Sequence, residues 1–293
     1  MRARSVTPRL PLRTAPHDRN SSSSGLDLAA NREEPDLGQL AVLLDEPAAS
    51  AVMVDFDGTL APIVADPASA RAVPGAARTL GALSESFGSV AVVSGRPGEF
   101  LQRRLRSAGP LVRLYGLYGM EEVVGNEIRI DPRVAPWLPI VAAAREAAER
   151  SVPIGVGLED KIVSLTIHWR GAPGAAGWAT GFAESQCDRV GLRHRFGRMS
   201  VELLPPIDID KGSVVAATAK SMRAACYFGD DVGDLDAFRA LERLRRSGTA
   251  TVRVAVGDAE SPPEVLAAAD MIVEGPSEAC RILRELAERA DRP

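Results

Sequence analysis

The stretch VMVDFDGTL, residues 52–60, joins an apolar run to two acidic residues and a glycine turn. Asp55 and Asp57 follow the apolar run directly, at the kind of strand end where open α/β sheets bind ligands. Two carboxylates at such a place repel each other unless a cation, or a phosphate with a metal, neutralises them. The DxD pair alone also fits two turn-forming acids, but the β-branched hydroxyl of Thr59 after Gly58 makes the whole string more specific. The stretch therefore predicts a buried strand that ends in a ligand site.

From residue 51 onward, short apolar runs alternate with helical segments. This alternation is typical of a parallel sheet wrapped by crossover helices. The further strands expected in the sheet are SVAVVSGR (89–96), LVRLYGLYG (111–119), ACYFGDD (225–231) and TVRVAVG (251–257). The expected helices cover 74–87, 99–107, 211–222, 234–246 and 277–290. We therefore predict an α/β fold with a doubly wound, Rossmann-like parallel sheet.

Between about residues 126 and 205 the pattern changes. Helices are expected over 135–150 and 174–190, and the expected strands around them are NEIRID, PIGVGLED, KIVSLTIHWR, LRHRF and MSVELLP. Strand, helix and hairpin in this repeated order describe a small antiparallel α+β layer. We expect residues 126–205 to form an inserted α+β domain, and residues 36–125 and 206–293 to form the core.

The N-terminal segment, residues 1–35, contains few apolar residues and a run of serines from Ser21 to Ser24. Such a composition cannot repay the entropy of ordering, so we expect a disordered tail. It lacks the apolar central region and the cleavage site of a targeting peptide. After the tail, a short helix from Asp36 is expected to carry apolar side chains toward the core, namely Leu37, Leu40, Val42, Leu43 and Leu44.

Charge and composition narrow the class of partner. The 35 Lys and Arg and the 39 Asp and Glu give a net charge of -4, which offers no overall attraction for nucleic acid or an anionic membrane. A small-molecule partner is expected instead. The longest apolar runs fall short of the roughly 20 residues of a membrane helix. Cys187, Cys226 and Cys280 are widely separated and lack CxxC spacing, which favours a reducing cytoplasm over zinc binding or redox chemistry.

Three further motifs carry chemistry, although each alone also fits an ordinary turn or surface group. Ser94, in VSGRP, lies at a strand end where its hydroxyl and nearby backbone N–H groups can hold a phosphate oxygen. Lys211 directly precedes a predicted helix, where the helix dipole disfavours a cation, so we expect an acidic partner. CYFGDDVGD brings Asp230, Asp231 and Asp234 to the end of the next strand, where three acids imply a metal or a lysine partner.

These four pieces, in this order, resemble the haloacid dehalogenase superfamily of phosphatases over roughly residues 51–290. The resemblance implies a Mg²⁺-dependent phosphatase that forms an aspartyl-phosphate. The implied roles are nucleophile for Asp55, general acid and base for Asp57, phosphate binding for Ser94, and charge neutralisation for Lys211. The expected Mg²⁺ ligands are Asp55, Asp57, Asp230 and Asp231, whose hard oxygens favour Mg²⁺ over zinc. Asp231 and Asp234 are expected to position water or Lys211.

Several strings are similar to trehalose-6-phosphate phosphatases in particular, namely DFDGTLAPI, VSGRP, LEDKIVSLTIHWR, VELLPP, DKG and GDDVGDLDAF. The resemblance implies that the insertion is a cap that closes over a sugar phosphate, with trehalose 6-phosphate as the expected substrate. The substrate-contacting residues expected from it are Thr59, Gly95, Arg96, Glu121, Glu159, Lys161 and Glu202. The last four are the expected partners of sugar hydroxyls. His168 alternates with apolar residues on a strand, and we assign it no part in proton transfer.

Four positions depart from the family pattern. Tyr118, in GLYGME, stands where the family commonly has a histidine, and Leu204 stands where an arginine precedes the proline. Gly233 and Leu235 replace a threonine and a glutamate. The catalytic set is intact but the sugar-binding set is altered, so another sugar phosphate or a glycosyl-glycerate phosphate stays open as the substrate. A non-catalytic sensor of phosphorylated sugars and a phosphomutase also stay open.

Overall fold

The computed structural model of the protein describes residues 37–64, 66–197, 199–257 and 261–292. The disordered tail predicted over residues 1–35 lies outside these residues. The first described element is a 3-10 helix, η1 (Gly38–Leu44). Leu37, Leu40 and Leu43 are buried in the core beside it, as predicted, although the helix has 3-10 geometry.

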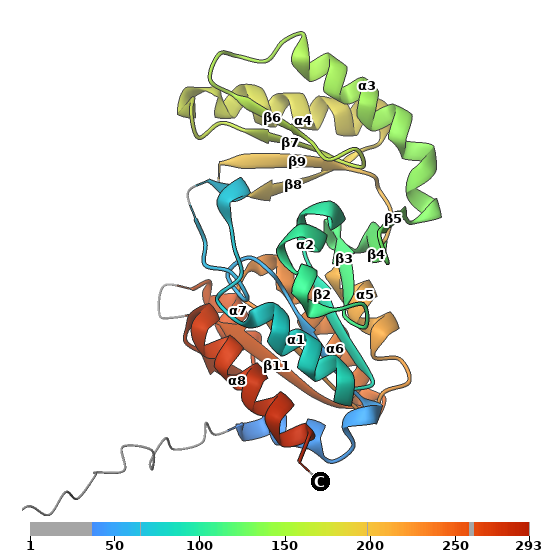
Figure 1. Cartoon of the computed structure of the whole chain (residues 1–293). Coiled ribbons are helices and arrows are strands. Elements are labelled where there is room, and N and C mark those ends of the chain that lie inside the picture. The colour runs from blue at the N-terminus through green and yellow to red at the C-terminus, as the bar shows by residue number, and fades with distance from the viewer. Residues whose placement is uncertain (1–36, 65, 198, 258–260, 293) are drawn as a thin grey trace, which may run out of the picture. The chain divides into compact units, whose positions relative to one another are not determined.

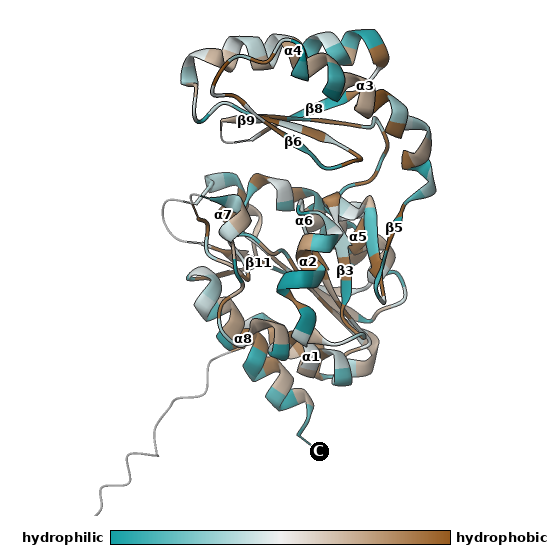
Figure 2. Ribbon diagram, turned by 45° about the horizontal axis from the view of Figure 1, so that its top comes forward, coloured by the Kyte–Doolittle hydropathy of each residue, from teal (hydrophilic) through white to brown (hydrophobic). Residues whose placement is uncertain are grey.

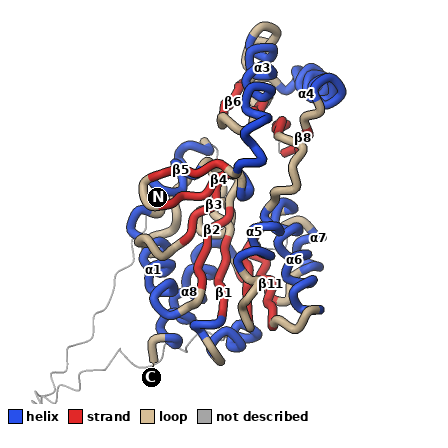
Figure 3. The backbone as a smooth tube through the Cα atoms, turned by 90° about the vertical axis from the view of Figure 1, so that its right-hand side faces the viewer, coloured by secondary structure: helices blue, strands red, loops and turns tan. Residues whose placement is uncertain are grey.

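The larger sheet is mostly parallel. Among the described residues it has eight strands, in the spatial order β12 (Met271–Val273), β11 (Ala250–Val256), β10 (Ala224–Gly229), β1 (Ser50–Val54), β2 (Ser89–Val93), β3 (Arg113–Gly116), β4 (Glu121–Val124) and β5 (Glu127–Ile130). The strands from β12 to β3 are parallel, and β4 and β5 extend one edge antiparallel. Figure 3 shows β1, β2 and β3 side by side. All of β1 is buried, which explains its continuous apolar run.

Helices lie on both faces of this sheet (Figure 1). Successive side chains of a strand point to opposite faces. The helices of this part are α1 (Ala76–Ser86), α2 (Gly98–Arg104), α5 (Lys211–Thr218), α6 (Leu235–Arg246), α7 (Pro263–Ala268) and α8 (Gly275–Ala290). In β1, Val52 and Val54 join the core formed with α1 and α8, whereas Ala51 and Met53 join the core formed with α5, α6 and α7. The predicted doubly wound sheet is confirmed.

The described residues between β5 and α5 form a second, antiparallel sheet. Its spatial order is β6 (Gly157–Asp160), β7 (Leu165–His168), β9 (Ser200–Leu204) and β8 (Arg193–Gly197). The helices α3 (Leu138–Glu149) and α4 (Ala176–Val190) pack against one face of it (Figure 1). On β7, Leu165 and Ile167 join these helices in an apolar core. An inserted α+β layer was predicted and is confirmed.

One strand lies in a different sheet from the one predicted. The sequence pattern groups NEIRID with the insertion, but β5 pairs with β4 in the larger sheet, so that prediction was wrong. Only Gly125 and Asn126 separate the two strands. The φ of Gly125 is 62°, and such positive angles suit the turns of two-residue hairpins. Because a hairpin joins adjacent strands, β5 completes the edge of the larger sheet.

Short 3-10 helices connect many of the longer elements. Besides η1 they are η2 (Pro47–Ala49), η3 (Pro67–Ser69), η4 (Arg106–Ala108), η5 (Leu117–Gly119), η6 (Pro132–Trp137), η7 (Pro173–Ala175) and η8 (Val232–Asp234). Helices are coloured in alternating teal and brown in Figure 2, as expected for helices with one face in the core. Within the described residues, no helix has the length and apolar character needed to cross a membrane.

Candidate active site

Three of the predicted motifs meet at one edge of the larger sheet. β1 lies between β10 and β2 and is parallel to both. The residues that follow their carboxyl ends therefore lie beside one another, which brings Asp55, Ser94 and Asp230 to the same edge. The sequence predicts this arrangement from three separate strand ends.

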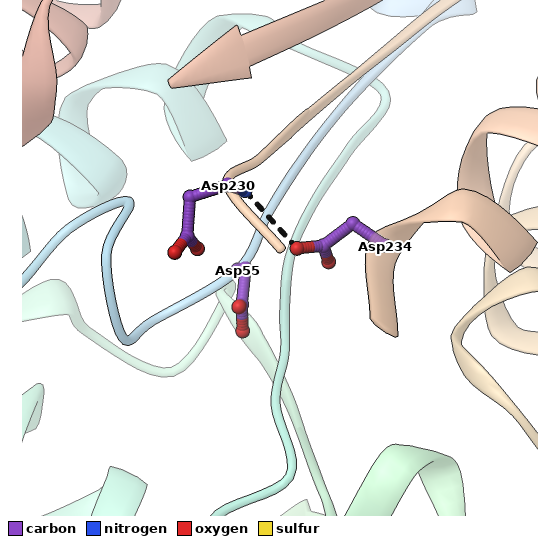
Figure 4. A group of neighbouring side chains, drawn as sticks. All are labelled: Asp55, Asp230 and Asp234. Atoms are coloured by element: carbon purple, nitrogen blue, oxygen red, sulfur yellow. Dashed lines mark hydrogen bonds between the residues drawn. The ribbon is translucent and has the colours of Figure 1, made fainter. Parts of the chain in front are cut away.

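Asp55, Asp230 and Asp234 form a compact carboxylate cluster (Figure 4). One oxygen from each carboxylate lies within 4.8 Å of the others. Asp234 Oδ2 also accepts a hydrogen bond of 3.1 Å from the backbone N–H of Asp230, drawn as a dashed line in Figure 4. Gly58 makes room for this arrangement, because a Cβ at this position would overlap the Asp230 carboxylate. The φ of Gly58 is 72°, which also favours glycine. The glycine of the DFDGT turn is thus required by the approach of Asp230.

Lys211 joins two members of the cluster. Its Nζ lies 2.9 Å from Asp55 Oδ2 and 2.6 Å from Asp234 Oδ1, and its side chain is 5% exposed. Burial opposes the charged form, but the carboxylates of Asp234 and Asp55 outweigh it and raise the pKa of Lys211. Lys211 is therefore held as an ammonium. The sequence predicts an acidic partner for Lys211, and the structure shows two, Asp55 and Asp234.

When all three carboxyl groups are ionised, the cluster carries more negative charge than Lys211 offsets. Burial raises the pKa of Asp55, an effect that Lys211 opposes and Asp234 strengthens. Burial also raises the pKa of Asp230, and the charges of Asp55 and Asp234 add to the rise. Such a set of clustered carboxylate oxygens fits a hard divalent cation such as Mg²⁺. A cation bound there would balance the charge.

Asp57 lies outside the cluster and is paired with Arg96. Arg96 Nε donates to Asp57 Oδ2 at 2.6 Å, and Arg96 Nη2 donates to Asp57 Oδ1 at 2.8 Å. Ser94 Oγ accepts a hydrogen bond of 3.2 Å from the backbone N–H of Arg96. Burial lowers the pKa of Arg96, but the bonded Asp57 and the nearby Glu159 raise it further than burial lowers it. The SGR turn and the DxD loop are therefore joined by a two-bond ion pair.

The remaining predicted core residues have other partners. Thr59 Oγ1 donates to Asp230 Oδ1 at 3.3 Å, so this hydroxyl contacts the cluster. Asp231 is exposed and its carboxylate accepts the backbone N–H of Val232 at 2.7 Å, which caps η8. Of the four predicted metal ligands, Asp55 and Asp230 lie in the cluster, while Asp57 and Asp231 do not. The third member of the cluster is Asp234.

The second sheet has a polar face opposite its helices. The cross-strand register sets Glu159 opposite Thr166, Thr166 opposite Glu202, and Glu202 opposite Arg195. Because side chains at paired positions share a face, these residues form one row across the sheet. The apolar neighbours on β7 and β9 point the other way, into the core with α3 and α4.

Glu202 is the centre of this polar face. Its Oε1 accepts hydrogen bonds from Lys161 Nζ at 3.1 Å and from Ser164 Oγ at 2.7 Å. Its Oε2 accepts one from Tyr118 Oη at 3.2 Å, a residue that follows β3 in the larger sheet. Two of the four predicted sugar-binding residues, Lys161 and Glu202, are thus in contact, with side chains 10% and 7% exposed.

The other two predicted sugar-binding acids, Glu159 and Glu121, bond to residues outside the Glu202 cluster. Glu159 forms a 2.9 Å contact with His168 Nε2. The bond to His168 lowers the pKa of Glu159 against the effect of burial. Glu121 belongs to β4 of the larger sheet, is 5% exposed, and accepts the backbone N–H of Gly98 at 2.6 Å. Glu121 therefore caps the start of α2 and does not lie on the polar face of the second sheet.

Several residues that contact the predicted site residues were not predicted from the sequence. Tyr227 Oη donates to Asp234 Oδ1 at 2.7 Å and is fully buried. A phenol inside the apolar run ACYFG was a signal for such a bond, because a buried hydroxyl needs a partner. Ser164 and Arg195 were also missed, and Tyr118 was noted only as a departure from the family pattern. No sequence spacing relates these three residues to Glu202.

Comparison with known proteins places this geometry in a family. A family model described as trehalose-phosphatase matches residues 53–267. An uncharacterized glycosyl hydrolase of Mycobacterium tuberculosis is 32% identical over 250 residues, which are 81% of this chain and 18% of that protein. The trehalose-phosphate phosphatase of Mycobacterium avium is 30% identical over 254 residues, which are 83% of this chain and 63% of that protein. The chain thus spans less than two thirds of the length of these curated relatives.

A solved structure supports the fold. The C-terminal domain of the C. albicans trehalose-6-phosphate phosphatase has a TM-score of 0.67 with this structure and 23% sequence identity, and the match covers 87% of this chain and 99% of that one. At this identity the likeness concerns the fold alone. The family model covers both the strand end at Asp55 and the acidic turn at Asp230. The chain therefore belongs to the trehalose-phosphatase family.

Proposed function

We propose that the protein is a phosphoric monoester hydrolase that removes phosphate from a small sugar phosphate, with Asp55 as the nucleophile. The observation that carries this proposal is the buried Asp55 carboxylate, held 2.9 Å from Lys211 and clustered with Asp230 beside the Ser94 turn. A free carboxylate is a weak nucleophile, so its surroundings must align it with phosphorus and offset the repulsion from phosphate. Lys211 supplies part of that positive charge.

In the first step, an Oδ atom of Asp55 attacks phosphorus and the bond from phosphorus to the sugar oxygen breaks. Asp57, acting as a carboxylic acid, gives its proton to the leaving alkoxide. The Ser94 hydroxyl and Lys211 bind phosphoryl oxygens, where charge develops in the transition state. The products of this step are the free sugar and an aspartyl-phosphate.

In the second step, water attacks the phosphorus of the aspartyl-phosphate. Asp57, now a carboxylate, takes a proton from that water. The bond between phosphorus and Asp55 breaks, which returns Asp55 as a carboxylate and releases inorganic phosphate. Asp57 thus serves first as the acid and then as the base, and it ends the cycle protonated.

The pair of Asp57 with Arg96 belongs to the state without substrate. Both carboxylate oxygens of Asp57 accept a hydrogen bond from Arg96, whereas in the first step one of them must carry the proton for the leaving group. We therefore expect Arg96 to leave Asp57 when substrate binds. The charge of Glu159 already acts on Arg96, and the substrate phosphate offers a second acceptor.

The metal is proposed to be Mg²⁺, held by Asp55, Asp230 and Asp234. Asp234 is preferred to Asp57 and Asp231 as the third ligand because one of its oxygens lies within 4.8 Å of oxygens of Asp55 and Asp230. When bound, the ion offsets the repulsion between carboxylate and phosphate and stabilises charge on the phosphoryl oxygens.

The second sheet with α3 and α4 is proposed to act as a specificity cap. The proposal keeps the predicted division into a core over 36–125 and 206–293 and an insertion over 126–205, except that β5 belongs to the larger sheet. The polar row of Glu159, Thr166, Glu202 and Arg195 supports it, because carboxylates, a hydroxyl and a guanidinium suit a polyol.

The proposed substrate is trehalose 6-phosphate. The name of the M. avium relative, a trehalose-phosphate phosphatase, supports this choice. The altered positions Tyr118 and Leu204 leave other sugar phosphates as competitors. The three thiols Cys187, Cys226 and Cys280 are free, which supports a reducing compartment, and we propose the cytoplasm.

The test is release of inorganic phosphate from a panel of trehalose 6-phosphate, glucose 6-phosphate, sucrose 6-phosphate and mannosyl-3-phosphoglycerate, each with Mg²⁺ and with EDTA. The proposal predicts Mg²⁺-dependent release that is fastest with trehalose 6-phosphate. Faster release from another sugar phosphate of the panel would change the proposed substrate but leave the proposed reaction unchanged. Binding of a sugar phosphate without release, even in a single turnover, would instead identify a sensor.

A further inference from the structure

Tyr118 lies in a strained turn that is fixed to the SGR segment. Leu117 and Tyr118 have φ of 49° and 64°, angles that residues other than glycine rarely adopt. The backbone N–H of Tyr118 donates to the carbonyl of Ser94 at 2.8 Å, and that of Leu117 donates to the carbonyl of Arg96 at 2.9 Å. These two bonds hold the unusual backbone in place. Tyr118 is thus positioned by the same segment that we propose to bind phosphate.

The ring of Tyr118 packs between the two sheets. A Cβ added to Gly95 would come 2.8 Å from Cζ and Oη of the ring, so the phenol rests on the bare backbone of Gly95. The guanidinium carbon of Arg195, on β8, lies 4.2 Å from the ring centroid. Arg195 therefore contacts the ring as a cation over an aromatic face.

The hydroxyl of Tyr118 completes the hydrogen bonds of Glu202. Of the three donors to this carboxylate, Lys161 and Ser164 come from the second sheet, and Tyr118 comes from the larger one. Burial raises the pKa of Tyr118 and the Glu202 charge raises it further, so the phenol keeps the proton that it donates. One residue thus connects Gly95 in the core with Lys161 and Glu202 in the proposed cap.

We infer that Tyr118 is a positioning residue that sets the Lys161–Glu202 pair relative to the phosphate-binding turn. This inference rests on the proposed function, because it concerns how the sugar end of the substrate is aligned with its phosphate. The backbone bonds of Tyr118 maintain the turn, and the hydroxyl maintains the cap pair. The two contributions are separable, since Tyr118→Phe removes only the hydroxyl.

The first test compares Tyr118→Phe with the wild type on trehalose 6-phosphate and on p-nitrophenyl phosphate. The KM for the sugar phosphate should rise on the order of tenfold, from the loss of one buried hydrogen bond to a charged group. Its kcat should change little, because the sugar contacts form in the bound substrate and in the transition state alike. Turnover of the aryl phosphate should not change. Tyr115→Phe is the matched control, since Tyr115 is a buried tyrosine in the apolar core that also contains Val214 and Val215 of α5.

The second test asks whether Tyr118 acts through Glu202. In a double-mutant cycle, Tyr118→Phe should add nothing to the KM of Glu202→Gln if both changes disturb one hydrogen-bonded unit. Full additivity of the two effects, or an equal loss with both substrates, would overturn the inference and leave Tyr118 a structural residue.

A third measurement does not depend on turnover. Without the Tyr118 hydroxyl, backbone hydrogen exchange across residues 158–166 should be faster than in the wild type and in Tyr115→Phe. If the wild type releases phosphate from no sugar phosphate, the proposed function is wrong. The exchange data would still test whether the Tyr118 hydroxyl holds the Lys161–Glu202 pair in place. Unchanged exchange together with an unchanged KM, in an enzyme that does turn over sugar phosphates, would reject the role of Tyr118 alone.

Discussion

The carboxylate cluster of the larger sheet and the Glu202 cluster of the second sheet differ in how far their buried negative charge is balanced by nearby groups. In the first, the three carboxylates of Asp55, Asp230 and Asp234 lie around one ammonium, Lys211, which contacts Asp55 and Asp234. In the second, a single carboxylate accepts hydrogen bonds from an ammonium and two hydroxyls. Burial of an unbalanced charge costs free energy, whereas a satisfied carboxylate is stable where it lies.

This difference separates the tasks of the two regions. The cluster at the edge of the larger sheet is incomplete until a cation and a phosphate balance it, so changes there should affect the chemical step. The Glu202 cluster is complete without a ligand and presents a fixed polar surface. Changes there should affect the choice of substrate.

The largest expected effect comes from Asp55→Asn, which should abolish turnover. An amide can neither attack phosphorus nor give a metal a full charge. Phosphate release by the purified, folded variant measures this. Asp208→Asn makes the same change at an exposed side chain and should leave the rate unchanged. Appreciable activity in Asp55→Asn would reject the covalent mechanism.

Asp57→Asn should lower kcat by ~10²–10⁴-fold, because both proton transfers depend on this carboxyl group. The loss should be smaller for the first step with p-nitrophenyl phosphate, whose leaving group needs no proton. Burst kinetics with the two substrates separate the first step from the second. If the aryl phosphate gives no rescue, Asp57 contributes by positioning groups and not as the acid.

A smaller effect is expected from Glu159→Ala and Lys161→Ala in the second sheet. Each should lower kcat/KM for the sugar phosphate, and the fall should correspond to a loss of about 1–3 kcal/mol of transition-state stabilisation. The reason is that each change leaves a hydroxyl of the substrate without its hydrogen-bond partner. Hydrolysis of p-nitrophenyl phosphate should be unaffected. Parallel losses with both substrates would instead make these residues part of an interface that closes for every substrate.

The smallest expected effect concerns stability and pH. The folded-state pKa values of Asp55 and Asp230 are raised above those of the unfolded chain, so their contribution is fully present at low pH. It is lost as the pH rises through the folded-state values, and the loss should be on the order of 1 kcal/mol or more. Urea unfolding in EDTA at about pH 5 and about pH 8 measures it. Saturating Mg²⁺ should reduce this pH-dependent loss of unfolding free energy in the wild type but not in Asp230→Asn. If Mg²⁺ reduces the loss equally in both proteins, Asp230 is not a metal ligand.

The parts of the site that follow strand ends could be predicted from the sequence. Asp55, Ser94 and Asp230 each follow an apolar run, and parallel pairing brings such ends together. The side-chain partners could not be predicted in this way. Asp231 and Asp234 are equally acidic in the sequence, but η8 turns Asp231 outward as its cap and directs Asp234 toward Lys211.

The second sheet gave weaker signals. Glu121 was grouped with the sugar-binding residues, but it lies on β4 of the larger sheet, where its carboxylate accepts the backbone N–H of Gly98. Tyr118 and Glu202 are far apart in the sequence, and no pattern of polarity relates them. Such contacts depend on how one sheet's polar face meets a turn of the other, which local periodicity does not encode.

The most direct test of the central claim is detection of phosphate on Asp55 itself. Asp57→Asn, mixed with p-nitrophenyl phosphate and Mg²⁺ and quenched in acid, should carry one phosphoryl group by intact-protein mass spectrometry. The first step proceeds because p-nitrophenolate leaves without a proton, whereas the second step is slow because water activation is lost. Hydroxylamine should remove the group, as it does from an acyl phosphate, and peptide mapping should locate it on Asp55. The double variant Asp55→Asn with Asp57→Asn should carry none. A wild type that turns over the substrate while neither it nor Asp57→Asn ever carries phosphate would contradict the account.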